Sequence, residues 1–148
     1  MPDKNSKQIR SKVTSDGNIE ISIATVEKPI PSDNEVLIKV EAAPINPSDL
    51  GLLLSFAADL STINISGSGN ETVTSMKINP SLMSAMKSRL DQSMPVGNEG
   101  AGVIVDAGGN AKDLMGKVVG LAGGSMYSQY RCVPASSCLV MNEGISSA

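Results

Sequence analysis

Two short polar segments carry the side chains best suited to chemistry. The first spans residues 46–49 (Asn-Pro-Ser-Asp), and the second is Asn98 followed by Glu99. A carboxamide offers two donors and an acceptor, a hydroxyl one donor and two acceptor positions, and an ionised carboxylate only acceptors. The chain has no histidine, which removes the usual general base and the commonest metal ligand. These residues therefore suit the hydrogen-bonded orientation of a bound group.

A short helix is expected to position the first of these segments. Asn46 can serve as N-cap, Pro47 suits the first helical position, and Asp49 places negative charge in the first turn. Apolar residues follow at helical spacing, namely Leu50, Leu53, Leu54 and Ala57. A second helix is predicted to begin at Asn79-Pro80. Its apolar stripe, which we expect to serve packing, is Leu82, Met83, Met86 and Leu90.

The rest of the chain has the pattern of short strands. Alternating or β-branched runs occur at 8–13, 19–23, 35–43, 102–105, 117–121, 125–133 and 138–141. The turn signals between them are rich in glycine, whereas residues 59–78 are rich in Ser, Thr, Asn and Gly and are predicted to be irregular. We therefore predict a mostly β fold with short helices, in the form of a mostly antiparallel β-barrel, as a single domain over residues 1–148.

Composition excludes several classes of function. The 148 residues carry a formal net charge of −3 and 2% aromatics, so neither a basic phosphate-binding face nor base-stacking platforms for nucleic acid are expected. No apolar run approaches the ~20 residues that span a bilayer, and the N-terminus lacks an apolar signal region. Two cysteines give no disulfide framework. We expect a cytoplasmic protein that binds neither nucleic acid nor membrane.

Three blocks in a fixed order resemble medium-chain dehydrogenases/reductases, particularly the quinone reductase and enoyl reductase branch. Residues 43–50 (APINPSDL) resemble the family's strand-to-helix corner, and residues 95–104 (PVGNEGAGVI) its Gly-His-Glu-Gly-Ala-Gly segment. Residues 116–135 resemble its "G-D-R-V" and "G-x-Y-A-E-Y" strands. The order and spacing agree over about residues 30–148, except for the long stretch 51–94.

The resemblance implies a GroES-like, partly open β-barrel with an extra helix-containing insertion at 51–94. It also implies a C-terminal Rossmann domain in the parent protein. This chain has no Gly-x-Gly-x-x-Gly between a strand and a helix, so we expect that domain to be absent and the chain alone to be inactive. The implied activity is NAD(P)H-dependent reduction of quinones, enones or related carbonyl compounds, with NADPH (or NADH) bound by the full-length parent. A homodimeric parent is compatible with the resemblance.

Zinc-dependent members of the family hold a catalytic metal with a Cys and a His. Here Asn46 stands at the Cys position and Asn98 at the His position, while the family's Glu remains as Glu99. A neutral amide is a poor Zn²⁺ ligand compared with thiolate or imidazole. We therefore expect no metal site, and we expect Asn46, Asn98 and Glu99 to face the substrate or cofactor.

Each of these side chains also has a simpler structural role open to it. Asn46 could orient a substrate carbonyl or the nicotinamide amide, or it could only cap the helix. Ser48 stands where the family has the hydroxyl that relays protons, and it could equally form a local hydrogen bond. Asn46 and Ser48 are our candidate catalytic residues. Tyr127 and Tyr130 are expected on the barrel surface or at an interface.

One departure from the family keeps a second function class open. In the enoyl and quinone reductases a short Gly-x-Tyr turn soon follows the Asn-Pro-Ser-Asp helix, and its Tyr can donate the proton; the stretch 51–94 here is longer and has no Tyr. The lost metal ligands and the missing Tyr favour a non-catalytic binding or scaffold protein on the same fold. A GroES-type co-chaperonin fits less well, because the long insertion and the dehydrogenase-like order of the motifs speak against a heptameric lid.

Overall fold

The protein is mostly β with short helices, as the sequence predicts. A computed structural model describes residues 4–55 and 58–147. The strands are β1 (Asn5–Val13), β2 (Asn18–Glu27), β3 (Glu35–Ala42), β4 (Ala58–Ser66), β5 (Val73–Ile78), β6 (Ser93–Pro95), β7 (Glu99–Ala107), β8 (Val118–Ala122), β9 (Tyr130–Pro134) and β10 (Leu139–Val140). The helices are α1 (Pro47–Leu53) and the 3₁₀ segments η1 (Gly69–Glu71), η2 (Pro80–Arg89), η3 (Gly109–Leu114) and η4 (Ala135–Ser137).

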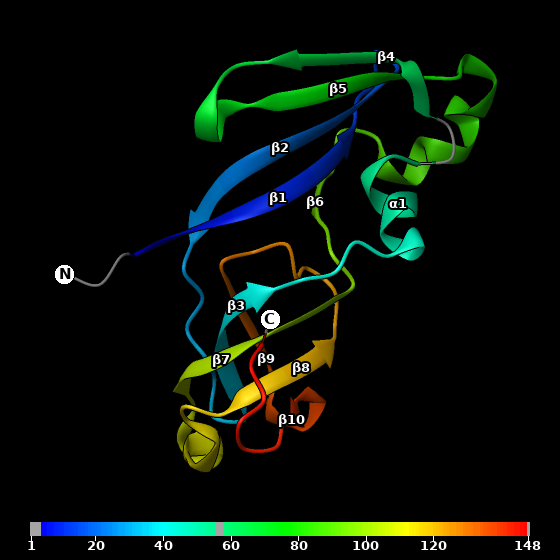
Figure 1. The fold of residues 1–148 in the computed structure, drawn as a ribbon. Helices are drawn as coiled ribbons and strands as arrows, with labels where there is room; N and C mark the ends of the chain where they lie inside the picture. Colours follow the sequence, from blue (N-terminus) through cyan, green and yellow to red (C-terminus); the bar gives the residue numbers. More distant parts are fainter. Residues whose placement is uncertain (1–3, 56–57, 148) are drawn as a thin grey trace. The chain divides into compact units, whose positions relative to one another are not determined.

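The strands form two five-stranded sheets (Figure 1). One has the order β4-β5-β2-β1-β6 and the other β10-β8-β7-β3-β9. Neither order returns to its first strand, so each sheet keeps two edges within the described part of the chain. This arrangement confirms the predicted fold class, a partly open β structure. None of the helices in residues 4–55 and 58–147 is long and apolar enough to cross a membrane.

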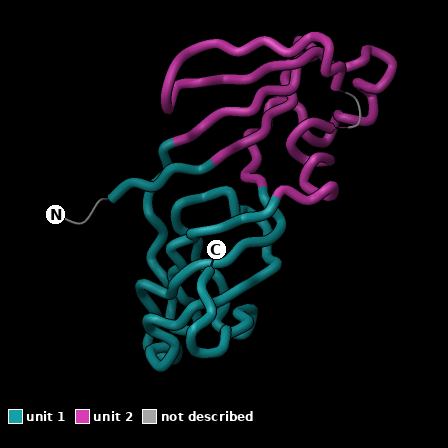
Figure 2. Tube along the Cα trace, viewed as in Figure 1, with its two compact units in different colours: residues 1–8, 25–44, 97–148 teal, residues 9–24, 45–96 magenta. Residues whose placement is uncertain are grey.

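The chain divides into two compact units, coloured separately in Figure 2. Unit 1 comprises residues 1–8, 25–44 and 97–148, and unit 2 comprises 9–24 and 45–96. The core of unit 1 contains Val36, Ile38, Ala107, Ala111, Ile104, Val119, Leu121, Met126 and Val133. The core of unit 2 contains Val13, Ile19, Met76, Ile78 and Met86. Each unit therefore buries its own apolar cluster, and the single domain over 1–148 stays a prediction.

The first predicted helix is confirmed in position. α1 has Asn46 as N-cap and Pro47 at its first position. The predicted apolar stripe is only partly correct, because Leu53 and Leu54 are half-buried whereas Leu50 is 44% exposed. Ala57 lies outside the described residues.

The prediction of an irregular segment over 59–78 is wrong. Strands β4 and β5 lie side by side there as an antiparallel hairpin (Figure 1), with η1 between them. The sequence does not predict this hairpin. Its strand β4 is an edge strand whose large apolar residues stay exposed. Its hydrophobic side chains Leu60, Ile63 and Ile65 are all more than half exposed, and they are too few among Ser, Thr and Asn to give a strand pattern over the whole of β4.

The second helix begins where Asn79-Pro80 predicts, but it is a 3₁₀ segment. The Asn79 side chain accepts a hydrogen bond from the backbone N–H of Ser81 at 3.1 Å. In the predicted stripe, Met86 is buried and Met83 and Leu90 pack on the same core, while Leu82 is 40% exposed. The predicted stripe assumes an α-helix with 3.6 residues per turn, whereas a 3₁₀ helix has three. The side chains of the stripe therefore do not all point to the same side, which explains the partial match.

The predicted strand over 125–133 begins later than expected, at Tyr130. Ser125 has a φ of +62°, a left-handed conformation that strands do not accommodate. Residues 125–129 instead contain two bends and an isolated β-bridge between Ser128 and Gln8.

A single arginine connects three elements of unit 2. Arg89, at the end of η2, donates from one guanidinium nitrogen to the Leu52 carbonyl at 3.0 Å and to the Ser11 hydroxyl at 3.2 Å. Ser11 in turn donates to the Leu53 carbonyl at 3.2 Å. Carbonyls at a helix C-terminus lack intrahelical partners, so Arg89 and β1 together satisfy the end of α1.

Replacing Arg89 should therefore destabilise unit 2. We expect Arg89→Met to lower the free energy of unfolding by about 1–3 kcal/mol, because the hydroxyl of the buried Ser11 and the Leu52 carbonyl lose their donor. Chemical denaturation followed by circular dichroism measures the change. Lys87→Met, at an exposed position of the same 3₁₀ segment, is the matched control, and equal losses in both variants would contradict the assignment.

In unit 1, strand β7 approaches β3 through glycine. A Cβ atom added at Gly102 would lie 2.0 Å from the Lys39 carbonyl oxygen, and one added at Gly100 would lie 3.1 Å from the Ala42 carbonyl oxygen. Gly102 pairs with Val40 and Ala101 with Ala42, and the register of the two strands shifts between these two pairs. The glycine-rich block that the sequence singled out is therefore required for strand packing.

We expect Gly102→Ala to destabilise the chain by about 1–3 kcal/mol or more, because the added methyl group cannot fit without separating β3 from β7. Thermal unfolding measures the loss. Gly109→Ala is the control, since its added methyl group would meet only the Asp33 side chain at 3.7 Å. A Gly102→Ala variant as stable as this control would show that the strands are not so close.

Candidate functional site

Asn46 and Ser48 lie together at the start of α1 in unit 2. Asn46 has an extended backbone (φ −90°, ψ 156°), as an N-cap requires. The buried carboxylate of Asp49 accepts a hydrogen bond from the Asn46 backbone N–H at 2.8 Å, and the Asp49 N–H donates to the Asn46 carbonyl at 2.9 Å. These two bonds fix the backbone of Asn46, and the Asn46–Asp49 pair forms a capping box at the start of α1.

Ser48 borders a small groove of unit 2, whereas Asn46 does not line it. The groove has a volume of about 280 Å³. Its lining is Pro47, Ser48, Leu50, Gly51, Leu54, Ser55, Ala58 and Leu60. The exposed hydroxyl of Ser48 can therefore meet a molecule whose body contacts leucine side chains.

Asn98 and Glu99 lie together in unit 1, in a corner held by backbone hydrogen bonds. The Asn98 carbonyl accepts from the N–H groups of Gly123 and Gly124 at 3.1 and 3.2 Å. Gly97 has a φ of +95°, and a Cβ there would lie 2.6 Å from the Tyr127 ring. The turn after β8 is thus fastened to the start of β7, and a side chain at position 97 would open it.

Glu99 faces a cavity of unit 1 with a volume of about 610 Å³. The lining is made mainly of small or apolar residues, namely Ala42, Pro44, Glu99, Gly100, Ala101, Gly120, Leu121, Ala122, Ser137, Leu139 and Ser147. Among the described residues of this lining, Glu99 is the charged one. An exposed carboxylate beside small residues can accept hydrogen bonds from a flat group that approaches the strands.

The structure thus groups the four predicted site residues into two pairs, one in each unit. Asn46 and Ser48 share the first turn of α1, and Asn98 and Glu99 share the corner before β7. Within residues 4–55 and 58–147 no group of three or more His, Cys, Asp or Glu side chains could hold a metal ion. Reaction without zinc remains an expectation from the residue types.

The two tyrosines have structural contacts in unit 1. The Tyr127 hydroxyl donates to the Pro44 carbonyl at 2.9 Å, and the Lys28 ammonium lies 3.9 Å from the centre of the Tyr130 ring. The cysteine thiols are free, and burial raises the pKa of Cys138 as well as that of Cys132, which reaches about 11. Thiols with raised pKa values are poor nucleophiles at neutral pH.

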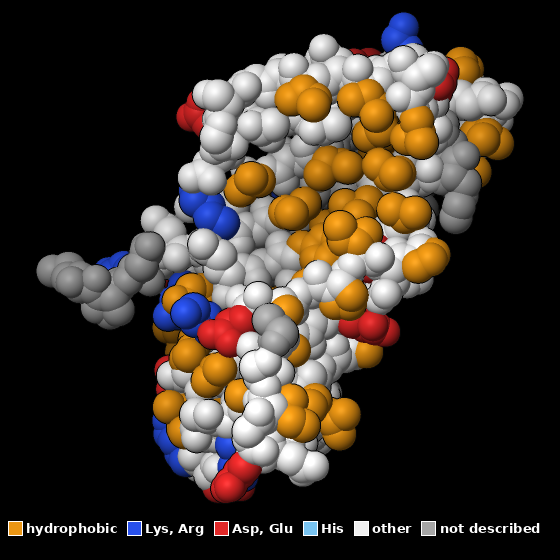
Figure 3. Space-filling model, viewed as in Figure 1, with side chains coloured by type: hydrophobic (Ala, Val, Ile, Leu, Met, Phe, Trp, Pro, Cys, Tyr) orange, Lys and Arg blue, Asp and Glu red, His pale blue; other side chains and the backbone are white. Residues whose placement is uncertain are grey.

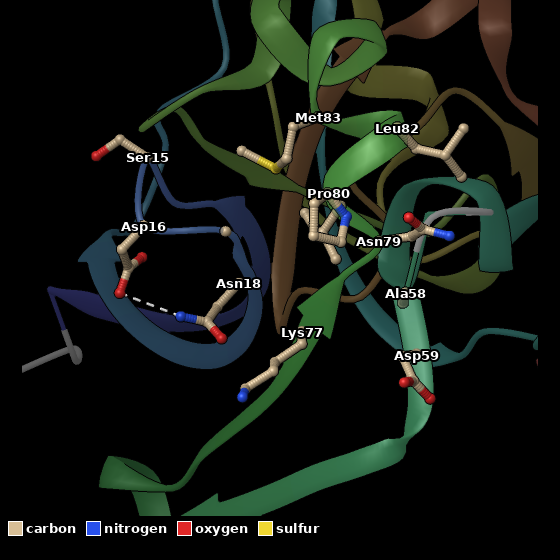
Figure 4. A pocket seen from close by; sticks show the side chains of 12 residues that line it. Ser15, Asp16, Asn18, Ala58, Asp59, Lys77, Asn79, Pro80, Leu82 and Met83 are labelled. Carbon is tan, nitrogen blue, oxygen red and sulfur yellow. Dashed lines mark hydrogen bonds between the residues drawn. The ribbon is translucent and has the colours of Figure 1, made fainter.

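Sequence reasoning missed a further cavity, which lies in unit 2 and has a volume of about 780 Å³ (Figure 4). Asp59, Lys77 and Asn18 occupy facing positions on β4, β5 and β2, and Asn18 donates to the Asp16 carboxylate at 3.1 Å. Hydrogen bonds from Ser61 lower the pKa of Asp59. This polar row depends on the hairpin register, so no local sequence signal could have predicted it.

Comparison with known proteins gives a likeness in structure only. No family model and no curated protein matches the chain. A protein from Mesorhizobium loti assigned as an NADPH:quinone reductase has a TM-score of 0.60 at 20% identity, covering 99% of this chain and 39% of that one. The quinone oxidoreductase from Coxiella burnetii has a TM-score of 0.60 at 17% identity, covering 97% of this chain and 39% of that one.

A mycobacterial protein complexed with NADPH has a TM-score of 0.56 at 18% identity, covering 96% of this chain and 34% of that one. The chain therefore spans less than two fifths of the length of these three solved structures. Identities of 20% or below establish the fold alone. The chain thus has the fold of one segment of the quinone oxidoreductase structures.

Proposed function

We propose that this chain forms the substrate-side part of an NAD(P)H-dependent oxidoreductase that reduces quinones, enones or related carbonyl compounds without zinc. The observation that carries the proposal is the likeness in fold to an assigned NADPH:quinone reductase over 99% of the chain. The residue types support a reaction without zinc. The sequence resembles medium-chain dehydrogenases/reductases, and Asn46 and Asn98 stand where the zinc-dependent members of that family have metal ligands. A cytoplasmic setting belongs to the same proposal.

A reduced nicotinamide, when bound by the parent protein, would supply a hydride, which is a proton together with two electrons. The protein's part is to bind and orient the acceptor. The Asn46 carboxamide can donate to a carbonyl oxygen, which stabilises negative charge that develops there. The Ser48 hydroxyl can also donate, and solvent supplies the proton that completes reduction of an enone or quinone.

Glu99 is the residue we assign to the cofactor side. Its carboxylate lies beside Gly100 and Ala101, and small side chains permit the close approach of a flat ring. A carboxylate accepts hydrogen bonds from an amide NH₂ group such as that of nicotinamide. We assign Asn98 a supporting role, since its carbonyl fastens the corner that presents Glu99.

A second candidate is a non-catalytic binding or scaffold protein on the same fold. The observation that favours it is the replacement of metal ligands by Asn46 and Asn98, together with the lack of Tyr in residues 51–94. A parent protein that binds no dinucleotide would support this candidate.

The test of the proposed function is nicotinamide oxidation by the longest reading frame that contains this chain. We expect oxidation of NADPH with a quinone or an enone, and no turnover by the 148-residue chain alone. Asn46→Ser retains a good N-cap but removes the amide donors, so kcat/KM should fall about tenfold while stability is unchanged. Asn142→Ser, at an exposed position, is the control. Failure to oxidise nicotinamide with any quinone or enone would refute the proposal.

The proposed reaction uses no thiolate, which gives a separate prediction. Because the pKa of Cys132 is raised from 9.0 to about 11, its thiolate population near pH 8 should be about a hundredfold lower than in the unfolded chain. Alkylation of Cys132 by iodoacetamide, followed by mass spectrometry, should be slow in the folded protein and accelerate as pH approaches 11. Rapid alkylation of the folded chain near neutral pH would contradict this.

A further inference from the structure

The groove of about 280 Å³ between α1 and the start of β4, here called the α1–β4 groove, has an aliphatic lining. We propose that it binds an unbranched aliphatic chain carried by the substrate, with the carbonyl-bearing head beside Ser48. The inference rests on the proposed function and extends it, because it specifies the substituent on the carbonyl compound. It also gives the stretch 51–94 a role in selecting the substrate.

The charge of the lining is the first observation. Among the residues that the structure describes, the lining of the α1–β4 groove contains no charged side chain. Its polar groups include the hydroxyls of Ser48 and Ser55, and the buried Ser55 hydroxyl donates to the Met86 sulfur at 3.3 Å. Ser48 lies in the first turn of α1 and is exposed. A polar head is therefore accommodated at Ser48, while the rest of the occupant must be uncharged.

The size of the groove is the second observation. Pockets that enclose a whole drug-sized molecule have volumes of roughly 300–1,000 Å³. The α1–β4 groove, at about 280 Å³, falls just below that range. It is therefore suited to one substituent of a larger molecule. The leucines that line it present flexible aliphatic surface, which a narrow hydrocarbon chain can follow.

The exposure of these leucines is the third observation. Leu50 is 44% exposed and Leu60 is 56% exposed. Beyond the groove, Ile63 on β4 is 52% exposed, and the sequence has no charged residue between Asp59 and Glu71. Hydrophobic side chains gather on this face of unit 2 in Figure 3. When an apolar ligand covers exposed apolar surface around a groove, less apolar surface faces water, and this lowers the free energy of the complex.

The geometry of β4 argues against another strand as the occupant. The register between β4 and β5 shifts between Asp59 and Asn64, and the Thr62 hydroxyl takes the place of a backbone acceptor by receiving the Lys77 N–H at 2.8 Å. An irregularity of this kind interrupts the edge of the sheet and discourages the addition of a further strand from a second copy. A flexible small ligand does not require a regular edge.

The experiment uses the 148-residue chain and a homologous series of methyl ketones, from methyl butyl ketone to methyl decyl ketone, in isothermal titration calorimetry. Each methylene buried in the groove should tighten Kd about fourfold until the groove is filled. Affinity that does not change with chain length would overturn the inference.

Three variants locate the effect. Leu50→Ser and Leu60→Ser, at positions exposed enough to leave the fold intact, should each weaken binding of the longer ketones about tenfold. Ile65→Ser is the matched control, because Ile65 lies on the same strand, is 67% exposed and does not line the groove. Equal weakening in the control, or a chain that is dimeric by sedimentation and becomes monomeric with Leu60→Ser, would overturn the proposal.

The two proposals fail separately. Ketone binding that depends on chain length, without nicotinamide oxidation by the longer reading frame, would retain the groove and refute the oxidoreductase. Reductase activity whose KM is indifferent to the alkyl length of the quinone, with no ketone binding, would retain the oxidoreductase and refute the groove.

Discussion

The close approach of β7 to β3 is the constraint on which unit 1 depends. These strands lie inside the sheet of order β10-β8-β7-β3-β9, so their spacing sets the position of every strand beside them. Only glycine fits where Gly102 faces the Lys39 carbonyl. The same run of glycines leads from Glu99 into the strand, so the residue assigned to the cofactor side is presented by the part of the sheet with the least room for change.

Much of the fold follows from local sequence signals. Asn46-Pro47 and Asn79-Pro80 each predict a helix start correctly, since capping and the fixed φ of proline act over a few residues. The strands with buried, alternating residues are also predictable. The β4–β5 hairpin is not, because its edge strand exposes Leu60 and Ile63 and is stabilised by pairing with β5. The residue pattern of a single strand does not show which distant segment it pairs with.

The candidate site is predictable in its residue types and less so in its surroundings. The first-turn charge of Asp49 could be predicted, yet its almost complete burial could not, because it arises from the packing of α1. Likewise the leucine spacing of α1 suggests a core face, whereas Leu50 borders a groove. Contacts made by Arg89 with Ser11 and Leu52 join residues far apart in sequence, and no periodicity indicates them.

The location of the tyrosines has a consequence for spectroscopy. The chain has no tryptophan, and both Tyr127 and Tyr130 belong to unit 1. Tyrosine emission therefore originates in unit 1, where the Tyr127 ring packs on Gly97 and the Tyr130 ring lies under Lys28. A tryptophan introduced at an exposed position of β4 would give unit 2 an emission of its own, so that the melting of each unit could be followed at a different wavelength.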